Sequence, residues 1–126
     1  MSFIHNILFE EKNTPKWKFI FWLNSLLLLY LTLMPSIQIK VSFANIDKVF
    51  HIIGFGSFAF FCFLAFPKLK NLSVTGIAVA LGILVEIIQS FLPSRSFSYL
   101  DMFADVFGIV LAVLFLSLLK NKYSIT

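Results

Sequence analysis

The sequence predicts an all-α protein, an integral membrane four-helix bundle with both termini in the cytoplasm. Of its 126 residues, 60% are hydrophobic and only 13% are charged, and the mean hydropathy is +0.95. A soluble domain of this size needs more polar surface to cover its core. The apolar residues also fall in blocks of about 18 to 20, the length at which a helix crosses a bilayer. The lipid bilayer is therefore the first expected partner.

The boundaries of the four spans follow from the prolines and charges that separate the apolar blocks. The spans are expected at residues 17–34, about 46–66, about 72–92 and 101–119, and a proline follows each of the first three. One membrane domain, residues 17–119, therefore fills most of the chain. Residues 1–16 are expected to be a cytoplasmic N-terminal tail, and residues 120–126 a cytoplasmic C-terminal tail.

The orientation follows from the distribution of Lys and Arg between the two ends of the spans. Seven basic residues lie on the side of the termini, and three lie on the other side: Lys40, Lys48 and Arg95. Cytoplasmic loops carry the excess of Lys and Arg, so the loops with Lys40 and Arg95 are expected to face outward.

The same distribution argues against nucleic acid as a partner, although the net charge is +4. The basic residues stand singly or in pairs at span ends, and no basic stripe exists for a phosphate backbone to follow. The only cysteine, Cys62, lies inside an apolar block and cannot form an internal disulfide. No motif indicates a cofactor, and none is predicted.

Most of the polar residues within the spans gather at the outward ends of three helices. Asp47, Lys48 and His51 begin the second span, Glu86 and Gln89 lie near the end of the third, and Asp101 and Asp105 begin the fourth. Arg95 lies in the loop between the last two spans. Ionisable side chains within a membrane span are costly, about 2.5–3.5 kcal/mol on insertion scales, and such groups usually face the interior of the bundle.

The helical faces agree with an inward orientation of these charges. Asp101, Asp105, Gly108 and Ala112 form one narrow stripe, and Glu86 shares a face with Gly82. Small residues mark the surfaces on which membrane helices approach closely. We therefore expect the acidic side chains to point toward neighbouring helices and away from lipid.

Structural explanations compete with functional ones for these residues. Asp47 and Asp101 lie near helix N-termini, where a carboxylate caps free N–H groups and interacts favourably with the helix dipole. That explanation does not extend to Glu86, which lies near a C-terminal end, or to Asp105, one turn inside its span. The alternatives for the group as a whole are a functional pocket and a purely structural polar cluster.

The polar residues follow a pattern that resembles the VanZ-like family of small membrane proteins. The matching elements are, in order, Asp47-Lys48-x-x-His51, Glu86-x-x-Gln89, Pro93-Ser94-Arg95 and Asp101-x-x-x-Asp105-x-x-Gly108. The resemblance covers about residues 45–115. Two positions depart from the family pattern: Asp105 stands where Asn is usual, and Ile52 stands where an aromatic residue is usual. The resemblance implies the bacterial cytoplasmic membrane and, for the founding member, an association with resistance to the glycopeptide teicoplanin.

Three functional hypotheses follow. In the first, an outward-facing pocket binds the polar headgroup of an envelope lipid or lipid-linked precursor, through ligand-binding residues Asp47, Lys48, Gln89, Arg95, Asp101 and Asp105. In the second, the site is catalytic, with His51 and Glu86 as the acid/base candidates. In the third, the cluster only packs helices together. A further alternative is a divalent metal site built from His51, Glu86, Asp101 and Asp105, whose nitrogen and oxygen donors on neighbouring helices suit such an ion. The spacing of these residues matches no known metal signature, so no metal ligand is assigned.

Overall fold

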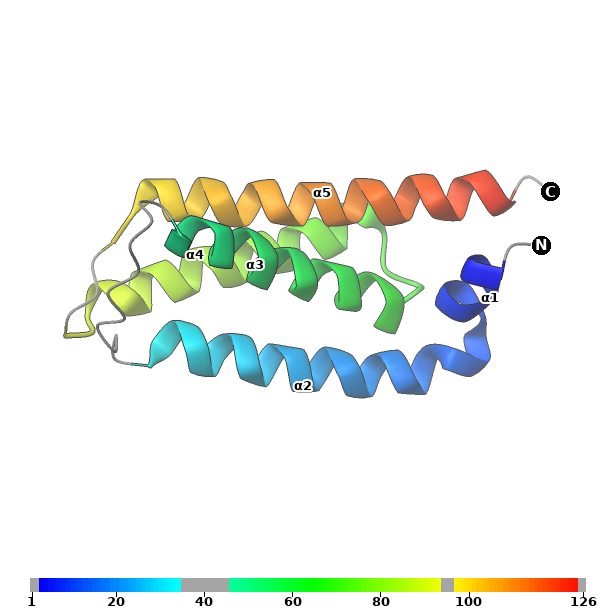
Figure 1. Cartoon of the computed structure of the whole chain (residues 1–126), viewed down its shortest axis with the longest axis horizontal. Helices are drawn as coiled ribbons and strands as arrows, with labels where there is room; N and C mark the ends of the chain where they lie inside the picture. The colour runs from blue at the N-terminus through cyan, green and yellow to red at the C-terminus, as the bar shows by residue number, and fades with distance from the viewer. Residues whose placement is uncertain (1–2, 35–45, 94–96, 125–126) are drawn as a thin grey trace.

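The computed structural model describes residues 3–34, 46–93 and 97–124, and these residues are almost entirely helical. The elements are α1 (Phe3–Phe9), the short 3-10 helix η1 (Glu11–Asn13), α2 (Thr14–Leu33), α3 (Ile46–Ala65), α4 (Asn71–Ser90) and α5 (Tyr99–Ser124). The four long helices lie lengthwise beside one another, and α1 lies near the end that carries both termini (Figure 1). Helix α3 contacts each of the other long helices, and its most extensive contact is with α5.

Three of the described helices are long and apolar enough to cross a membrane, namely α3, α4 and α5. Helix α2 is equally long at 20 residues, but Lys16, Lys18, Asn24 and Ser25 lower its hydropathy below that of the other three. The sequence predicts a fourth span in this segment, and that span stays a prediction.

The helix bounds lie close to the predicted ones, with two differences. Helix α5 continues to Ser124, beyond the predicted end at residue 119, because residues 120–124 contain no Gly or Pro and Lys122 interacts favourably with the C-terminal dipole. Within the predicted tail, residues 3–9 form α1. Asn13 closes the C-terminal end of this helix, because its side-chain Nδ2 donates to the carbonyl oxygens of Asn6 and Ile7 at 3.1 and 3.0 Å.

The core lies along α3, and small residues allow the neighbouring helices to approach it. Phe55, Ala59 and Cys62 of α3 are buried, as are Ile109 and Leu116 of α5. A Cβ atom at Gly108 would collide with the backbone carbonyl oxygen of Ile52, and one at Gly56 would lie 3.1 Å from the carbonyl oxygen of Gly108. The close approach expected on the aspartate stripe of α5 is therefore present, and its partner is α3.

The outer faces of the long helices expose many large apolar side chains. On α5 these include Leu111, Leu114, Phe115 and Leu118, all about half exposed or more. Soluble proteins rarely expose contiguous apolar surfaces of this extent, whereas lipid tails cover them without cost. These faces support the membrane location inferred from hydropathy.

Candidate functional site

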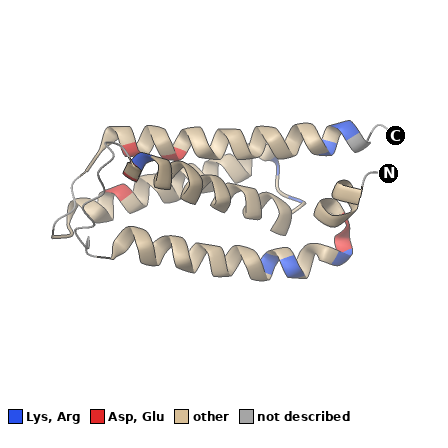
Figure 2. Ribbon diagram, viewed as in Figure 1, with Lys and Arg blue, Asp and Glu red and all other residues tan. Residues whose placement is uncertain are grey.

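Charged residues gather at the two ends of the molecule (Figure 2). Lys residues lie mainly at the end that carries the termini, whereas acidic residues of α3, α4 and α5 lie at the opposite end together with one Lys. Six residues at this opposite end are close together, and we call them the polar cluster: Asp47, Lys48, His51, Glu86, Asp101 and Asp105.

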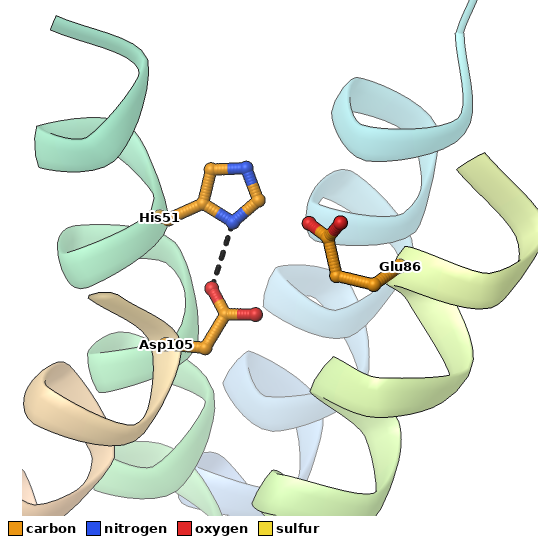
Figure 3. Close-up of side chains that lie close together, drawn as sticks. All are labelled: His51, Glu86 and Asp105. Carbon is orange, nitrogen blue, oxygen red and sulfur yellow. Dashed lines mark hydrogen bonds and ion pairs between the residues drawn. The ribbon is translucent and has the colours of Figure 1, made fainter. Parts of the chain in front are cut away.

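The centre of the polar cluster is a contact between α3 and α5. The Nδ1 atom of His51 lies 2.7 Å from Oδ1 of Asp105, within hydrogen-bond distance (Figure 3). The imidazole also stacks on Phe55, one turn further along α3, with ring centroids 6.1 Å apart. The carboxylate and the aromatic ring together fix the orientation of the imidazole. Its Nδ1 is thereby directed into the molecule.

Glu86 approaches this pair from α4 and is completely buried, with 0% of its surface exposed. Its Oε2 accepts a hydrogen bond of 3.1 Å from the backbone N–H of Ser98, which holds the start of α5 against α4. Its Oε1 is buried and has no hydrogen-bond partner among the described residues, and the same is true of Oδ2 of Asp105. One donor atom each from His51, Glu86 and Asp105 lie within 4.8 Å of one another, and Figure 3 shows the three side chains converging.

A chain of ion pairs connects this centre to the rim of the protein. The Nζ of Lys48 lies 3.0 Å from Oδ1 of Asp101 and 3.1 Å from Oδ2 of Asp47. The other carboxylate oxygen of Asp101 lies 3.6 Å from Nε2 of His51. Asp101 therefore lies beside both Lys48 and His51.

Exposure falls steadily along this chain. The side chain of Asp47 is 58% exposed, those of Lys48, Asp101 and His51 are 24%, 13% and 10% exposed, and that of Asp105 is 2% exposed. The polar cluster is thus a track of polar groups that leads from the surface to two buried carboxylates.

Helix capping at the start of α5 is provided by Ser98. Its Oγ accepts a hydrogen bond of 3.3 Å from the backbone N–H of Asp101, three residues later. The carboxylate of Asp101 is directed to Lys48 and His51. Ser98 was not predicted as a helix cap from the sequence. The pattern Ser98-x-x-Asp101 before an apolar block resembles a capping box and could have indicated this role.

Gln89, which the sequence predicts as a site residue, does not join the polar cluster. Gln89 is buried, and its Nε2 donates a 2.6 Å hydrogen bond to the backbone carbonyl oxygen of Thr32 in the last turn of α2. That carbonyl belongs to the last turn of a helix, where no intrahelical donor is available. Gln89 therefore ties α4 to α2. Arg95 lies outside the described residues.

The space beside the buried carboxylates is small. A cavity of about 60 Å³ lies between α4 and α5, and Gly82 and Asp105 are among its lining residues. A Cβ at Gly82 would lie 3.1 Å from Oδ2 of Asp105, so the glycine leaves room beside this unpartnered oxygen. The cavity has room for a few water molecules or a small ion and not for a lipid headgroup. A headgroup would have to engage the outer part of the track.

The chain was also compared with known proteins. A family model described as VanZ/LLP1 matches residues 3–120, which include the described helices α1 to α4, most of α5 and all of the polar cluster. No match was found among curated proteins or among solved structures.

Proposed function

The chain belongs to the VanZ/LLP1 family, and from this premise we propose that it is a multi-pass protein of the bacterial cytoplasmic membrane that binds the polar headgroup of an envelope lipid or lipid-linked precursor. The observation that carries the proposal is the track of polar groups from Asp47 to Glu86 and Asp105. Burying two carboxylates with unpartnered oxygens is expensive for a protein that needs only to pack helices, because apolar residues of similar size would do so at lower cost.

The position of the track supports a lipid ligand over a soluble one. The polar cluster lies at the end of α3, α4 and α5, at the depth where the headgroups of a bilayer spanned by these helices would lie. A lipid headgroup could therefore reach Lys48 and Asp101 while its tails cover the apolar outer faces of the helices. Arg95, on the same side of the spans, is proposed to pair with a phosphate or carboxylate, which its planar guanidinium suits.

An effect on sensitivity to teicoplanin belongs to the same proposal. The family resemblance implies this association for the founding member. A protein that binds envelope lipids or their precursors would alter the access of a large polar antibiotic to them.

Acid/base chemistry is the second candidate function, and a specific contact favours it. The 2.7 Å approach of Asp105 to Nδ1 fixes the imidazole of His51, as carboxylates do for catalytic histidines. Glu86 provides a second, buried carboxyl group, with one oxygen within 4.8 Å of a donor atom of His51. The single cysteine of the chain, Cys62, is buried in the core three turns along α3 from His51, so proton transfer or attack by water fits better than a covalent intermediate.

Headgroup binding is testable by native mass spectrometry of the protein released from detergent. The probes are phosphatidylglycerol, phosphatidylethanolamine and a polyprenyl phosphate. We expect Lys48→Ala and Asp101→Asn to lower the retention of at least one probe by fivefold or more, because both side chains line the outer part of the track. Glu11→Gln, an exposed acid away from the polar cluster, is the control and should bind as the parent does. Equal retention of all three lipids by parent and variants would indicate non-specific annular lipid and contradict the proposal.

The proposed topology places both termini in the cytoplasm and the polar cluster at the outer face. We expect Ser36→Cys to react with a membrane-impermeant maleimide in whole cells, and Ser2→Cys to react only after permeabilisation. The native Cys62 is buried, so the parent protein is the unlabelled control. The opposite labelling pattern would invert the topology and place the polar cluster in the cytoplasm.

A further inference from the structure

The buried centre of the polar cluster carries more negative charge than the other described residues balance. Glu86 and Asp105 are both almost completely buried, and each has one carboxylate oxygen without a partner among the described residues. The nearest ammonium group, that of Lys48, is already held by Asp47 and Asp101. The neighbouring imidazole supplies at most one positive charge. Two adjacent buried carboxylates are unfavourable unless a cation or a proton compensates them.

We propose that a divalent metal ion binds between His51, Glu86 and Asp105. The donor set is one imidazole nitrogen and two carboxylate oxygens from three helices, which suits Zn²⁺ or Mn²⁺ better than Ca²⁺ or Mg²⁺. An ion of charge +2 would balance the two carboxylates. The carboxylate oxygens of Glu86 and Asp105 that have no described hydrogen-bond partner would then coordinate the ion.

The geometry requires only a small adjustment to accept the ion. Donor atoms at about 2.1 Å from a metal lie about 3.4 Å apart in a tetrahedral arrangement, whereas the three donors here lie within 4.8 Å. A rotation of the Glu86 carboxyl group brings Oε1 inward, and this oxygen has no described hydrogen bond to lose. Nδ1 of His51 would exchange its contact with Asp105 for a bond to the ion.

The surroundings of His51 match those of a metal-binding histidine. Such a residue usually donates its second ring N–H to a carboxylate, which fixes the tautomer and the ring orientation. Here Nε2 lies 3.6 Å from Oδ2 of Asp101, just beyond hydrogen-bond distance, so a small shift would let Asp101 accept that N–H. The ion pair with Lys48 in turn holds Asp101 in place. Asp101 is thus a positioning residue for the proposed site.

The ion would leave at least one coordination position open, since the protein supplies three ligands. The cavity of about 60 Å³ that Asp105 lines together with Gly82 and apolar side chains has room for a water molecule on the Asp105 side of the ion. This inference rests on the proposed headgroup function for its biological use, because a +2 charge at the buried end of the track would attract an anionic headgroup held at its outer part. Metal binding itself is measured without any lipid.

The test uses the tag-free, full-length protein in detergent, treated with EDTA and then dialysed against Zn²⁺, Mn²⁺, Mg²⁺ or Ca²⁺ alone. We expect about one Zn²⁺ or Mn²⁺ per chain by elemental analysis, and a higher melting temperature with the ion than without it. Glu86→Gln and Asp105→Asn, which change proposed ligands, should lower the affinity for the metal ion at least tenfold. Asp101→Asn should lower it by about 10- to 100-fold, as is typical when a residue that holds a metal-binding histidine is changed. Glu11→Gln should bind as the parent does.

Metal-free melting curves of the variants separate loss of a ligand from loss of the fold. Variants that melt like the metal-free parent but bind no ion support the site. If the parent retains none of the four ions and none raises its melting temperature, the inference is wrong. Lipid retention measured with and without EDTA keeps the two proposals distinguishable. Lipid binding that persists in EDTA, together with no metal uptake, would overturn only the metal site, and metal uptake without lipid binding would overturn only the headgroup function.

Discussion

Gly108→Ala is expected to destabilise the protein, whereas Gly76→Ala is expected to leave its stability unchanged or to raise it. Both glycines lie inside helices that are long and apolar enough to cross a membrane, and Ala is about 1 kcal/mol more favourable than Gly in a helix interior. At Gly76 an added Cβ meets nothing within 4 Å, so only this gain applies. At Gly108 the same atom collides with the carbonyl oxygen of Ile52, and a backbone atom cannot rotate away. Helices α3 and α5 would have to separate.

The larger Gly108→Leu should cost more than Gly108→Ala, since overpacking in a close contact costs about 1–3 kcal/mol and sometimes more. Leu114→Ala on the exposed face of α5 is the matched control for a change of size without overpacking. Melting temperatures in one detergent, or the midpoint of SDS-induced unfolding, measure the series. If Gly108→Ala and Gly76→Ala are equally stable, the close contact between α3 and α5 is not as the structure describes it.

The sequence was sufficient to predict most of the helices, because prolines and charges punctuate its apolar blocks. Pro67 closely follows the end of α3, and Pro93 follows α4. Helix α1 was not predicted, since a seven-residue helix with mixed polarity has too little periodicity to be recognised. Its stability comes from contacts with distant residues of α5 and from Asn13, neither of which a local pattern contains.

The composition of the polar cluster was predictable, and its internal pairing was not. Helical periodicity and span ends placed His51, Glu86 and Asp105 at one end of the protein. The pairing of Asp105 with Nδ1 of His51 depends on how α3 and α5 are rotated and shifted relative to each other. The close packing at Gly108 determines that arrangement. For the same reason the sequence could not reveal that Gln89 turns toward Thr32 of α2.

Glu86→Gln is expected to abolish function with little loss of stability, and Glu86→Ala is expected to lose both. The amide oxygen of Gln can still accept the N–H of Ser98, which Oε2 accepts in the parent. Its amide group fills the same volume without the charge. Alanine removes the acceptor and leaves the partly buried N–H of Ser98 without this partner, which costs up to about 1–3 kcal/mol. It also adds a cavity beside the core.

This pair of substitutions distinguishes a functional site from a purely structural polar cluster. In a structural cluster, function depends on Glu86 only through the fold, so Glu86→Gln should retain both the melting temperature and the activity. In a functional site, the charge of Glu86 is needed for ligand or proton, and removal of that charge should lower activity at least tenfold in a folded protein. The measurements are melting temperature, lipid retention and teicoplanin sensitivity of cells that express parent, Glu86→Gln or Glu86→Ala at matched levels. His51→Ala and Asp105→Asn extend the comparison across the three helices. If loss of function follows loss of stability at all three positions, the polar cluster only holds α3, α4 and α5 together, and the functional proposals for it are wrong.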